Sequence, residues 1–109
     1  MQLDVPPIVA AYLAAEHEND ARRLSSCFAE DGFVHDEGQY HRGQDAIRRW
    51  KEEADTKYRY VSEPLISVID GYAVKVRARL TGDFPGSPLE LDHVFTLAGD
   101  KILSLVVHQ

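Results

Sequence analysis

The spacing of hydrophobic positions changes once along the chain, near residue 58. Before that point apolar residues recur at helical spacing, and beyond it apolar and polar residues alternate. The first pattern is typical of helices packed on one face, and the second of strands with two different faces. The helical patterns cover residues 6–17, 20–31 and 43–57. The alternating patterns cover residues 58–70, 72–84, 87–99 and 101–109, and residues 33–36 form a further short apolar segment. Helices followed by strands indicate an α+β domain.

Cap and turn residues predict where these elements end. Asn19 and Asp20 are both good N-caps for the second helix, and Gly32 is expected to end that helix in a left-handed conformation. Pro64 indicates an edge position or a bulge in the first long strand. Two-residue hairpin turns are expected at Asp70-Gly71 and Gly99-Asp100.

Two surfaces of the predicted elements bear on packing. In the third helix Arg48, Arg49, Lys51, Glu52 and Glu53 surround the apolar face, and this charged run is expected to be solvated. In the late strands Ile102, Val106 and either Phe95 or its neighbours are expected on the outer face of the sheet. Because such apolar side chains need cover, a homodimer through the outer sheet face is expected.

Length and charge narrow the classes of function. The chain has 109 residues, which suits one domain spanning residues 1–109. Its net charge is -6, which disfavours nucleic acid and anionic membrane as partners, since both need a basic surface. The single Cys27 excludes an intrachain disulfide, and no basic leader precedes the first apolar stretch. A cytoplasmic location is therefore expected.

The segment "LSSCFAEDGFVHDEGQYHRGQDAIRRW", residues 24–50, resembles the nuclear transport factor 2-like, or SnoaL-like, superfamily. Its members share a helix with an "FA-D" phrase, a short strand, a turn, an Arg-Gly pair and an "AI" pair. Here these are Phe28 to Asp31, residues 33–36, Arg42-Gly43 and Ala46-Ile47. The resemblance implies three N-terminal helices packed on a strongly curved antiparallel sheet. This cystatin-like arrangement forms a cone with an internal pocket.

The pattern of polar residues is closest to the ketosteroid isomerases of that superfamily. The resemblance implies that Asp36 is a catalytic base and that Tyr12, 24 residues earlier, donates to an oxyanion. It implies Asp92 as a second, protonated oxyanion donor. The ketosteroid isomerases divide the work in this way, with one aspartate as base and with a tyrosine and a protonated aspartic acid as donors. No metal and no cofactor are implied.

Other residues are expected to line the pocket. By resemblance Trp50 is a pocket wall, and Phe28 replaces a tyrosine that supports the oxyanion tyrosine. Glu16 departs from the isomerase pattern, which has an apolar residue there, and suits a more polar ligand. Leu105 and Val107 share one face of the last strand and are expected on the pocket side.

The alternation of the strand at residues 87–99 leaves the place of Asp92 open. If the apolar positions face the pocket, His93 points inward and Asp92 outward; a polar pocket would reverse this. Tyr12 could equally be a core residue, and Asp36 could cap the turn that follows it. His35 has the opposite parity to Asp36 and is expected on the other face. The histidines form no recognised metal-ligand spacing.

Three functions fit these patterns. The first is a cofactor-independent isomerase, cyclase or dehydratase that acts on a hydrophobic or aromatic carbonyl compound by acid–base catalysis. The second is a non-catalytic ligand-binding protein of the same fold. The third is a protein-interaction module that uses the outer sheet face. Fold alone does not choose among them.

Overall fold

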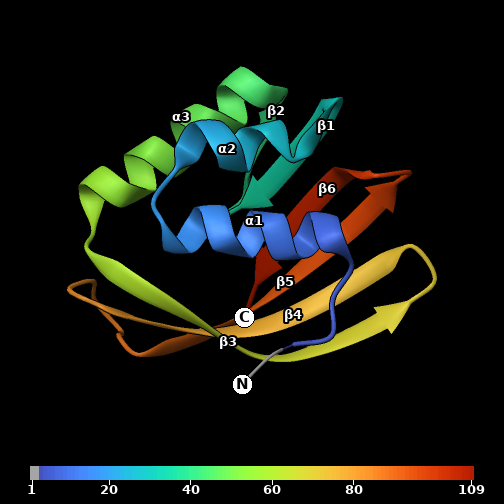
Figure 1. The fold of residues 1–109 in the computed structure, drawn as a ribbon. Coiled ribbons are helices and arrows are strands. Elements are labelled where there is room, and N and C mark those ends of the chain that lie inside the picture. Colours follow the sequence, from blue (N-terminus) through green and yellow to red (C-terminus); the bar gives the residue numbers. More distant parts are fainter. Residues whose placement is uncertain (1–2) are drawn as a thin grey trace.

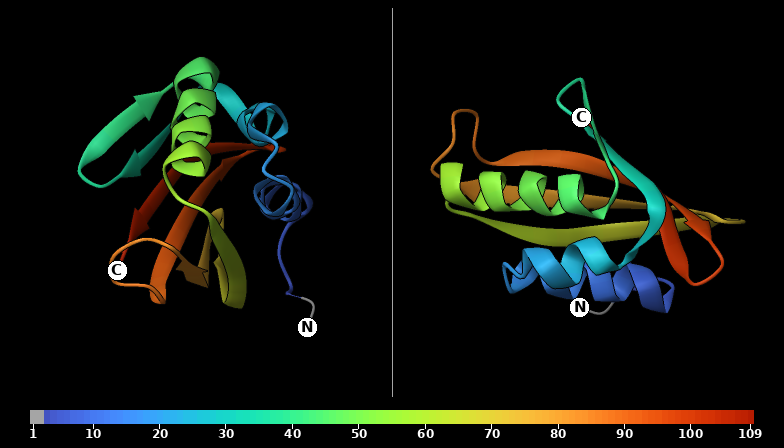
Figure 2. Two further views of the ribbon diagram at one scale, coloured as in Figure 1. Left: turned by 90° about the vertical axis from the view of Figure 1, so that its left-hand side faces the viewer. Right: turned by 90° about the horizontal axis from the view of Figure 1, so that it is seen from above.

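The computed structural model describes residues 3–109 as three helices and a six-stranded sheet. The helices are α1 (Pro7–His17), α2 (Ala21–Ser26) and α3 (Gln44–Lys57). The strands are β1 (Phe28–Asp36), β2 (Gln39–Arg42), β3 (Tyr60–Asp70), β4 (Ala73–Gly82), β5 (Leu89–Ala98) and β6 (Lys101–His108). The helices lie on one side of the curved sheet, which bends around them (Figures 1 and 2). The predicted α+β fold with helices on a curved sheet is confirmed. None of the described helices is both long and apolar enough to cross a membrane.

The strand order is β2-β1-β6-β5-β4-β3. Neighbouring strands are antiparallel except for β1 and β6, which run parallel. The first strand thus pairs with the last, and the sheet is mostly rather than wholly antiparallel. This pairing brings the end of β1 beside the end of β6, because Val34 and His35 pair with Leu105 and Val106.

The expected end of the second helix is wrong. Helix α2 ends at Ser26, and Gly32 lies buried within β1 instead of stopping a helix. A side chain at Gly32 would place its Cβ 3.0 Å from the carbonyl oxygen of Ala29 and 3.1 Å from that of Leu103. The glycine therefore allows a close backbone approach where the β1–β6 register shifts.

The strand β2 was not predicted. It forms a hairpin with β1 in which Asp36 pairs with Gln39, and Glu37 and Gly38 form the turn. Both turn residues have positive φ, 51° and 76°, which is the requirement of the tight turn that best matches strand twist. The hairpin fixes Asp36 at the last position of β1, next to α3.

Of the two predicted hairpin turns, one is correct and the other is displaced by one residue. Gly99-Asp100 joins β5 to β6 as predicted, since Ala98 pairs with Lys101. The other turn is one residue later than predicted, because Asp70 itself pairs with Ala73. Pro64 lies on the edge strand β3 and at a shift in its register with β4, as predicted.

The core lies between the concave face of the sheet and α1. Tyr12 of α1 is fully buried and contacts Phe28 and Phe95 edge-on, with ring centroids 6.1 Å and 5.1 Å apart. Burial of each such side chain contributes roughly 1.5–3 kcal/mol. The expectation that Phe95 and Ile102 face outward is wrong, because both are fully buried. A register shift at Thr96 and Leu97 turns Ile102 inward.

Candidate functional site

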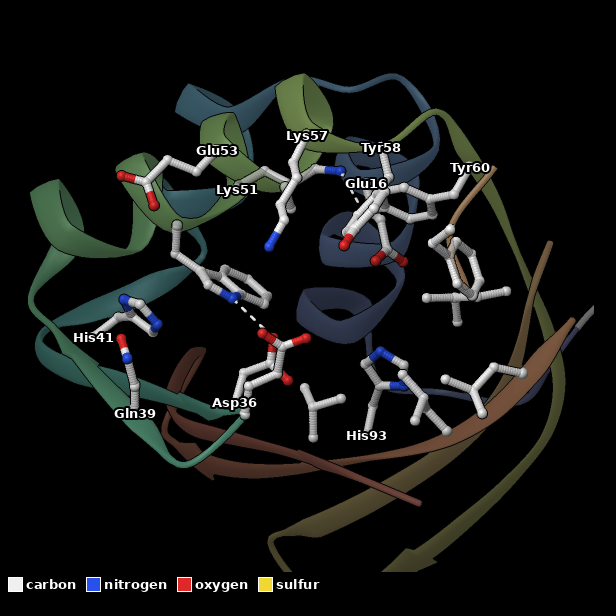
Figure 3. A pocket seen from close by; sticks show the side chains of 18 of the residues that line it. Glu16, Asp36, Gln39, His41, Lys51, Glu53, Lys57, Tyr58, Tyr60 and His93 are labelled. Carbon is white, nitrogen blue, oxygen red and sulfur yellow. Dashed lines mark hydrogen bonds between the residues drawn. The ribbon is translucent and has the colours of Figure 1, made fainter. Parts of the chain in front are cut away.

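A cavity of about 480 Å³ opens between α3 and the concave face of the sheet. Its size lies within the usual range for small-molecule sites. The walls come from α1, α3, the β1–β2 hairpin, the strands β3 to β6 and the β4–β5 connection (Figure 3). The polar and aromatic residues that line it include Glu16, Asp36, His41, Trp50, Lys51, Lys57, Tyr58, Tyr60 and His93.

Asp36 is held at the wall of this cavity by the indole of Trp50. The Nε1–H of Trp50 donates to Oδ2 of Asp36 at 3.0 Å. Among residues 3–109, Oδ1 of Asp36 has no hydrogen-bond partner. One oxygen of the carboxylate is therefore positioned and the other is available to take a proton. Asp36 does not cap its turn, so that alternative is not observed.

Tyr12 is a buried side chain beside the cavity and does not line it. Its hydroxyl is buried and has no hydrogen-bond partner in the described part of the chain. Burial raises the pKa of Tyr12 well above its ordinary value, and the charges of Glu16 and Asp36 raise it further. The phenol is thus a neutral proton donor at neutral pH. Its unsatisfied hydroxyl carries a cost of about 1–3 kcal/mol.

Asp92 does not lie in the cavity, so its predicted place there is wrong. It is on the outer face of β5, where Nε of Arg77 donates to its Oδ1 at 3.0 Å. This hydrogen bond from Arg77 lowers the pKa of Asp92. An ionised carboxylate cannot donate a hydrogen bond to an oxyanion. The reason is strand alternation: the apolar positions of β5 face the helices, and Asp92 has the opposite parity.

The inward position belongs to His93. Its side chain is 5% exposed, and it lines the cavity on the same side as Asp36 (Figure 3). The Nδ1 atom of His93 is buried without a partner in the described part of the chain. The ring stacks against Phe95 with centroids 6.5 Å apart. His93 therefore offers a second unpaired polar atom near the cavity.

The other predicted pocket residues divide into two groups. Glu16, Trp50 and Val107 line the cavity. Phe28 and Leu105 are fully buried in the adjoining core and do not line it. The structure thus brings Asp36 into the predicted pocket with three of its five predicted neighbours.

Sequence reasoning missed Lys51 and Tyr60, a hydrogen-bonded polar pair of the cavity wall. Lys51 was expected in the solvated charged run of α3, but it is 1% exposed. Its Nζ donates to Oδ1 of Asp55 at 2.6 Å and to the hydroxyl oxygen of Tyr60 at 3.0 Å. One signal was available: Lys51 follows Ile47 by four residues and so shares its buried helix face.

The charges of this pair are set by their neighbours. Burial by itself would lower the pKa of Lys51, but Tyr60 and the hydrogen bond to Asp55 outweigh burial and raise it. Burial and the charge of Glu16 raise the pKa of Tyr60, although Lys51 opposes them. At neutral pH the wall therefore presents an ammonium group and a neutral phenol.

The remaining histidines near the cavity contact aromatic rings. His41 lines the cavity and lies beside Trp50, with ring centroids 6.1 Å apart. His35 packs on Tyr40, with centroids 4.5 Å apart, and does not line the cavity, as its parity predicted. Within residues 3–109, no group of three or more His, Cys, Asp or Glu side chains is arranged to hold a metal ion.

Comparisons with solved structures identify close relatives of this fold. A candidate polyketide cyclase from Sinorhizobium meliloti is 44% identical, with a TM-score of 0.93 and 96% of each chain covered. A protein with a ketosteroid isomerase-like fold from Catenulispora acidiphila, solved with trimethylamine, is 24% identical with a TM-score of 0.85. That match covers 97% of this chain and 87% of the other.

A third structure, a nuclear transport factor 2-like protein of unknown function from Cytophaga hutchinsonii, is 14% identical with a TM-score of 0.76. The match covers 99% of this chain and 91% of the other. No curated protein matches the chain. The family model of the SnoaL-like domain matches residues 9–105. The chain therefore belongs to the SnoaL-like family.

Proposed function

We propose that the protein is a cofactor-independent acid–base enzyme, of the isomerase, cyclase or dehydratase type, that acts on a small carbonyl compound. Asp36 is the base. The observation that carries this proposal is the arrangement of its carboxylate, in which Trp50 holds Oδ2 while Oδ1 has no partner in the described residues. A positioned carboxylate in a cavity can remove a proton from carbon next to a carbonyl.

Removal of that proton places negative charge on the carbonyl oxygen, which then needs hydrogen-bond donors. Tyr12 and His93 are the groups near Asp36 whose polar atoms are buried and unpaired within residues 3–109. We assign them the donor roles, with His93 acting through its Nδ1–H tautomer. His93 thereby takes the role that the resemblance implied for Asp92. The proton on Asp36 returns to a different carbon, or leaves with a hydroxyl group, according to the substrate.

The test uses 2-tetralone, a neutral aryl ketone with acidic α-protons. Exchange of these protons with deuterated solvent is followed by NMR for wild type and for Asp36→Asn. We expect Asp36→Asn to lower the enzyme-catalysed rate by about 10²–10⁴-fold, the usual contribution of a general base. Asp92→Asn is the matched control on the outer face, and we expect its rate to stay within about twofold of wild type. Exchange by wild type no faster than in buffer would refute the proposal.

A second candidate is ligand binding without turnover. The hydroxyl of Tyr12 is fully buried and does not line the cavity, and this observation favours the non-catalytic alternative. In that case carbonyl compounds would raise the melting temperature of wild type and Asp36→Asn alike. No α-proton exchange above buffer would accompany that binding.

The predicted homodimer is proposed on the outer face of β3. Val61, Ile66 and Val68 point outward there and are 62%, 57% and 53% exposed. An apolar row on an edge strand favours pairing with a second copy or another protein. Sedimentation velocity of wild type and Val68→Lys tests this: a dimer that dissociates in the variant supports it. A monomeric wild type would contradict the dimer and leave a different protein as the partner of this surface.

A further inference from the structure

The pair formed by Lys51 and Tyr60 presents two unused hydrogen-bond donors at the cavity wall. An ammonium group has three N–H donors, and Lys51 uses two, one to Asp55 and one to Tyr60. Tyr60 accepts from Lys51, and lysine has no acceptor to offer in return. The O–H of Tyr60 must therefore point elsewhere, and no acceptor for it occurs among residues 3–109.

Both residues are fixed in place. Lys51 has a side chain that is 2% exposed and is tied to Asp55. Its Nζ also lies 5.2 Å from the centroid of the Tyr60 ring. The ammonium group of Lys51 is therefore desolvated, and Tyr60 is half-buried beside it. Hydrogen bonds made in such a place are stronger than those made in water.

The surrounding charges decide which acceptor fits. Glu16 lines the same cavity, and its charge acts on both Lys51 and Tyr60. Asp55 already compensates the ammonium group. With Asp36 also in the cavity, a carboxylate or phosphate ligand would meet net repulsion. A neutral oxygen, of a hydroxyl or a second carbonyl, accepts the same hydrogen bonds without that cost.

We propose that Lys51 and Tyr60 form a second oxygen-binding subsite, and that the substrate is a neutral carbonyl compound with a further hydroxyl or carbonyl group remote from the reacting one. This inference rests on the proposed function for the position of the reacting carbonyl. Figure 3 shows Lys51 and Tyr60 on the side of the cavity made by α3 and β3, facing Asp36 and His93 on the sheet side. One molecule can therefore contact both ends.

The experiment compares 2-tetralone with 6-hydroxy-2-tetralone, which adds one remote oxygen to the same skeleton. Calorimetric titration gives the dissociation constant of each compound, and α-proton exchange gives kcat and KM. We expect wild type to bind the hydroxyl compound about tenfold more tightly, as a hydrogen bond to a charged or desolvated donor allows. The hydroxyl compound should have a lower KM than 2-tetralone and a similar kcat, because the subsite lies away from the reacting carbon.

Tyr60→Phe removes only the hydroxyl and should abolish the preference for the hydroxyl compound. Lys51→Met should do the same. The matched control is Tyr58→Phe, because Tyr58 lines the same cavity and packs its ring edge-on against Phe84, with centroids 5.9 Å apart. Tyr58→Phe should keep the preference. If Lys51→Met does not fold, Tyr60→Phe alone decides.

Each outcome has one meaning. Equal affinities in wild type, no binding of either compound at its solubility limit, or a preference that survives Tyr60→Phe overturns the subsite. If Tyr60→Phe abolishes the preference and wild type shows no α-proton exchange, the subsite is supported and the proposed catalysis is refuted. Exchange of both compounds with equal KM supports the catalysis and refutes the subsite.

Discussion

Polar side chains on the outer face of β4 and β5 have partners, whereas two polar groups on the inner side have none among the described residues. On the outer face Arg77 contacts Asp92 and Glu90, and Arg79 contacts Glu90 and Glu63. Every one of these charged groups has a partner of opposite sign. On the inner side, Nδ1 of His93 and the hydroxyl of nearby Tyr12 have no hydrogen-bond partner within the described residues.

The two sides therefore differ in what their polar groups contribute to the free energy of unfolding. Apart from the carboxylate of Asp92, the side chains of these outer pairs are 41–65% exposed, and exposed pairs contribute about 0–1 kcal/mol each. An unpaired buried polar group costs about 1–3 kcal/mol, more than one exposed pair returns. Each such group needs a physical explanation, and a bound water or ligand can supply the missing partner. The hydroxyl of Tyr12 and Nδ1 of His93 are therefore places where the fold sacrifices stability.

The largest test of this contrast is Tyr12→Phe. Removal of the unpaired hydroxyl should raise the free energy of unfolding by about 1 kcal/mol, because a buried group without a partner is lost and the ring contacts remain. The same change should lower α-proton exchange by about tenfold or more, since it removes an oxyanion donor. Urea denaturation and NMR exchange measure the two effects. A variant that is less stable than wild type would show that the hydroxyl has a partner.

Alkaline pH is the next test. The pKa of Tyr12 is raised above its ordinary value of 10.0, first by burial. The folded protein therefore holds this proton more tightly than the unfolded chain does. The associated stability is complete below pH 10 and is lost as pH rises through the folded pKa.

We expect the urea midpoint of wild type to decrease as the pH is raised from about 9 to about 11. The decrease over the same range should be smaller for Tyr12→Phe. Three other groups with raised pKa values contribute to the remainder: Cys27 and Tyr60, raised by burial, and Lys51, raised by Tyr60 and Asp55. A Tyr12→Phe/Tyr60→Phe double variant should be flatter still. Identical slopes for wild type and Tyr12→Phe would contradict this account.

The smallest effect is expected on the outer face. Arg77 lowers the pKa of Asp92 below its ordinary value of 3.8, so the folded state releases this proton more readily. Stability from the pair is present above that value and is lost as pH falls through the folded pKa. Asp92→Asn should remove part of this acid loss and change the melting temperature at neutral pH by only a few degrees. High salt should reduce the difference, and a loss of catalysis in Asp92→Asn would refute its outer position.

Particular residues show how much of the structure the sequence patterns predicted. Asp36 and Trp50 line one cavity, and both lie in the segment that resembles the family. Gly99-Asp100 was correct because the conformational demands of a tight turn are local. Gly32 was wrong because its small size serves a contact with Leu103, 71 positions further along the chain.

The sequence by itself determined the order and type of the elements, because helical and strand periodicities are properties of short segments. It also determined the family, through one contiguous segment. Only the tertiary structure decided that His93 rather than Asp92 faces the cavity, since the inward face of a strand depends on which side the helices cover. Likewise, only the tertiary structure placed the buried Lys51 of α3 beside Tyr60 of β3. A charged residue on a helix becomes part of a binding wall only when another element closes over it.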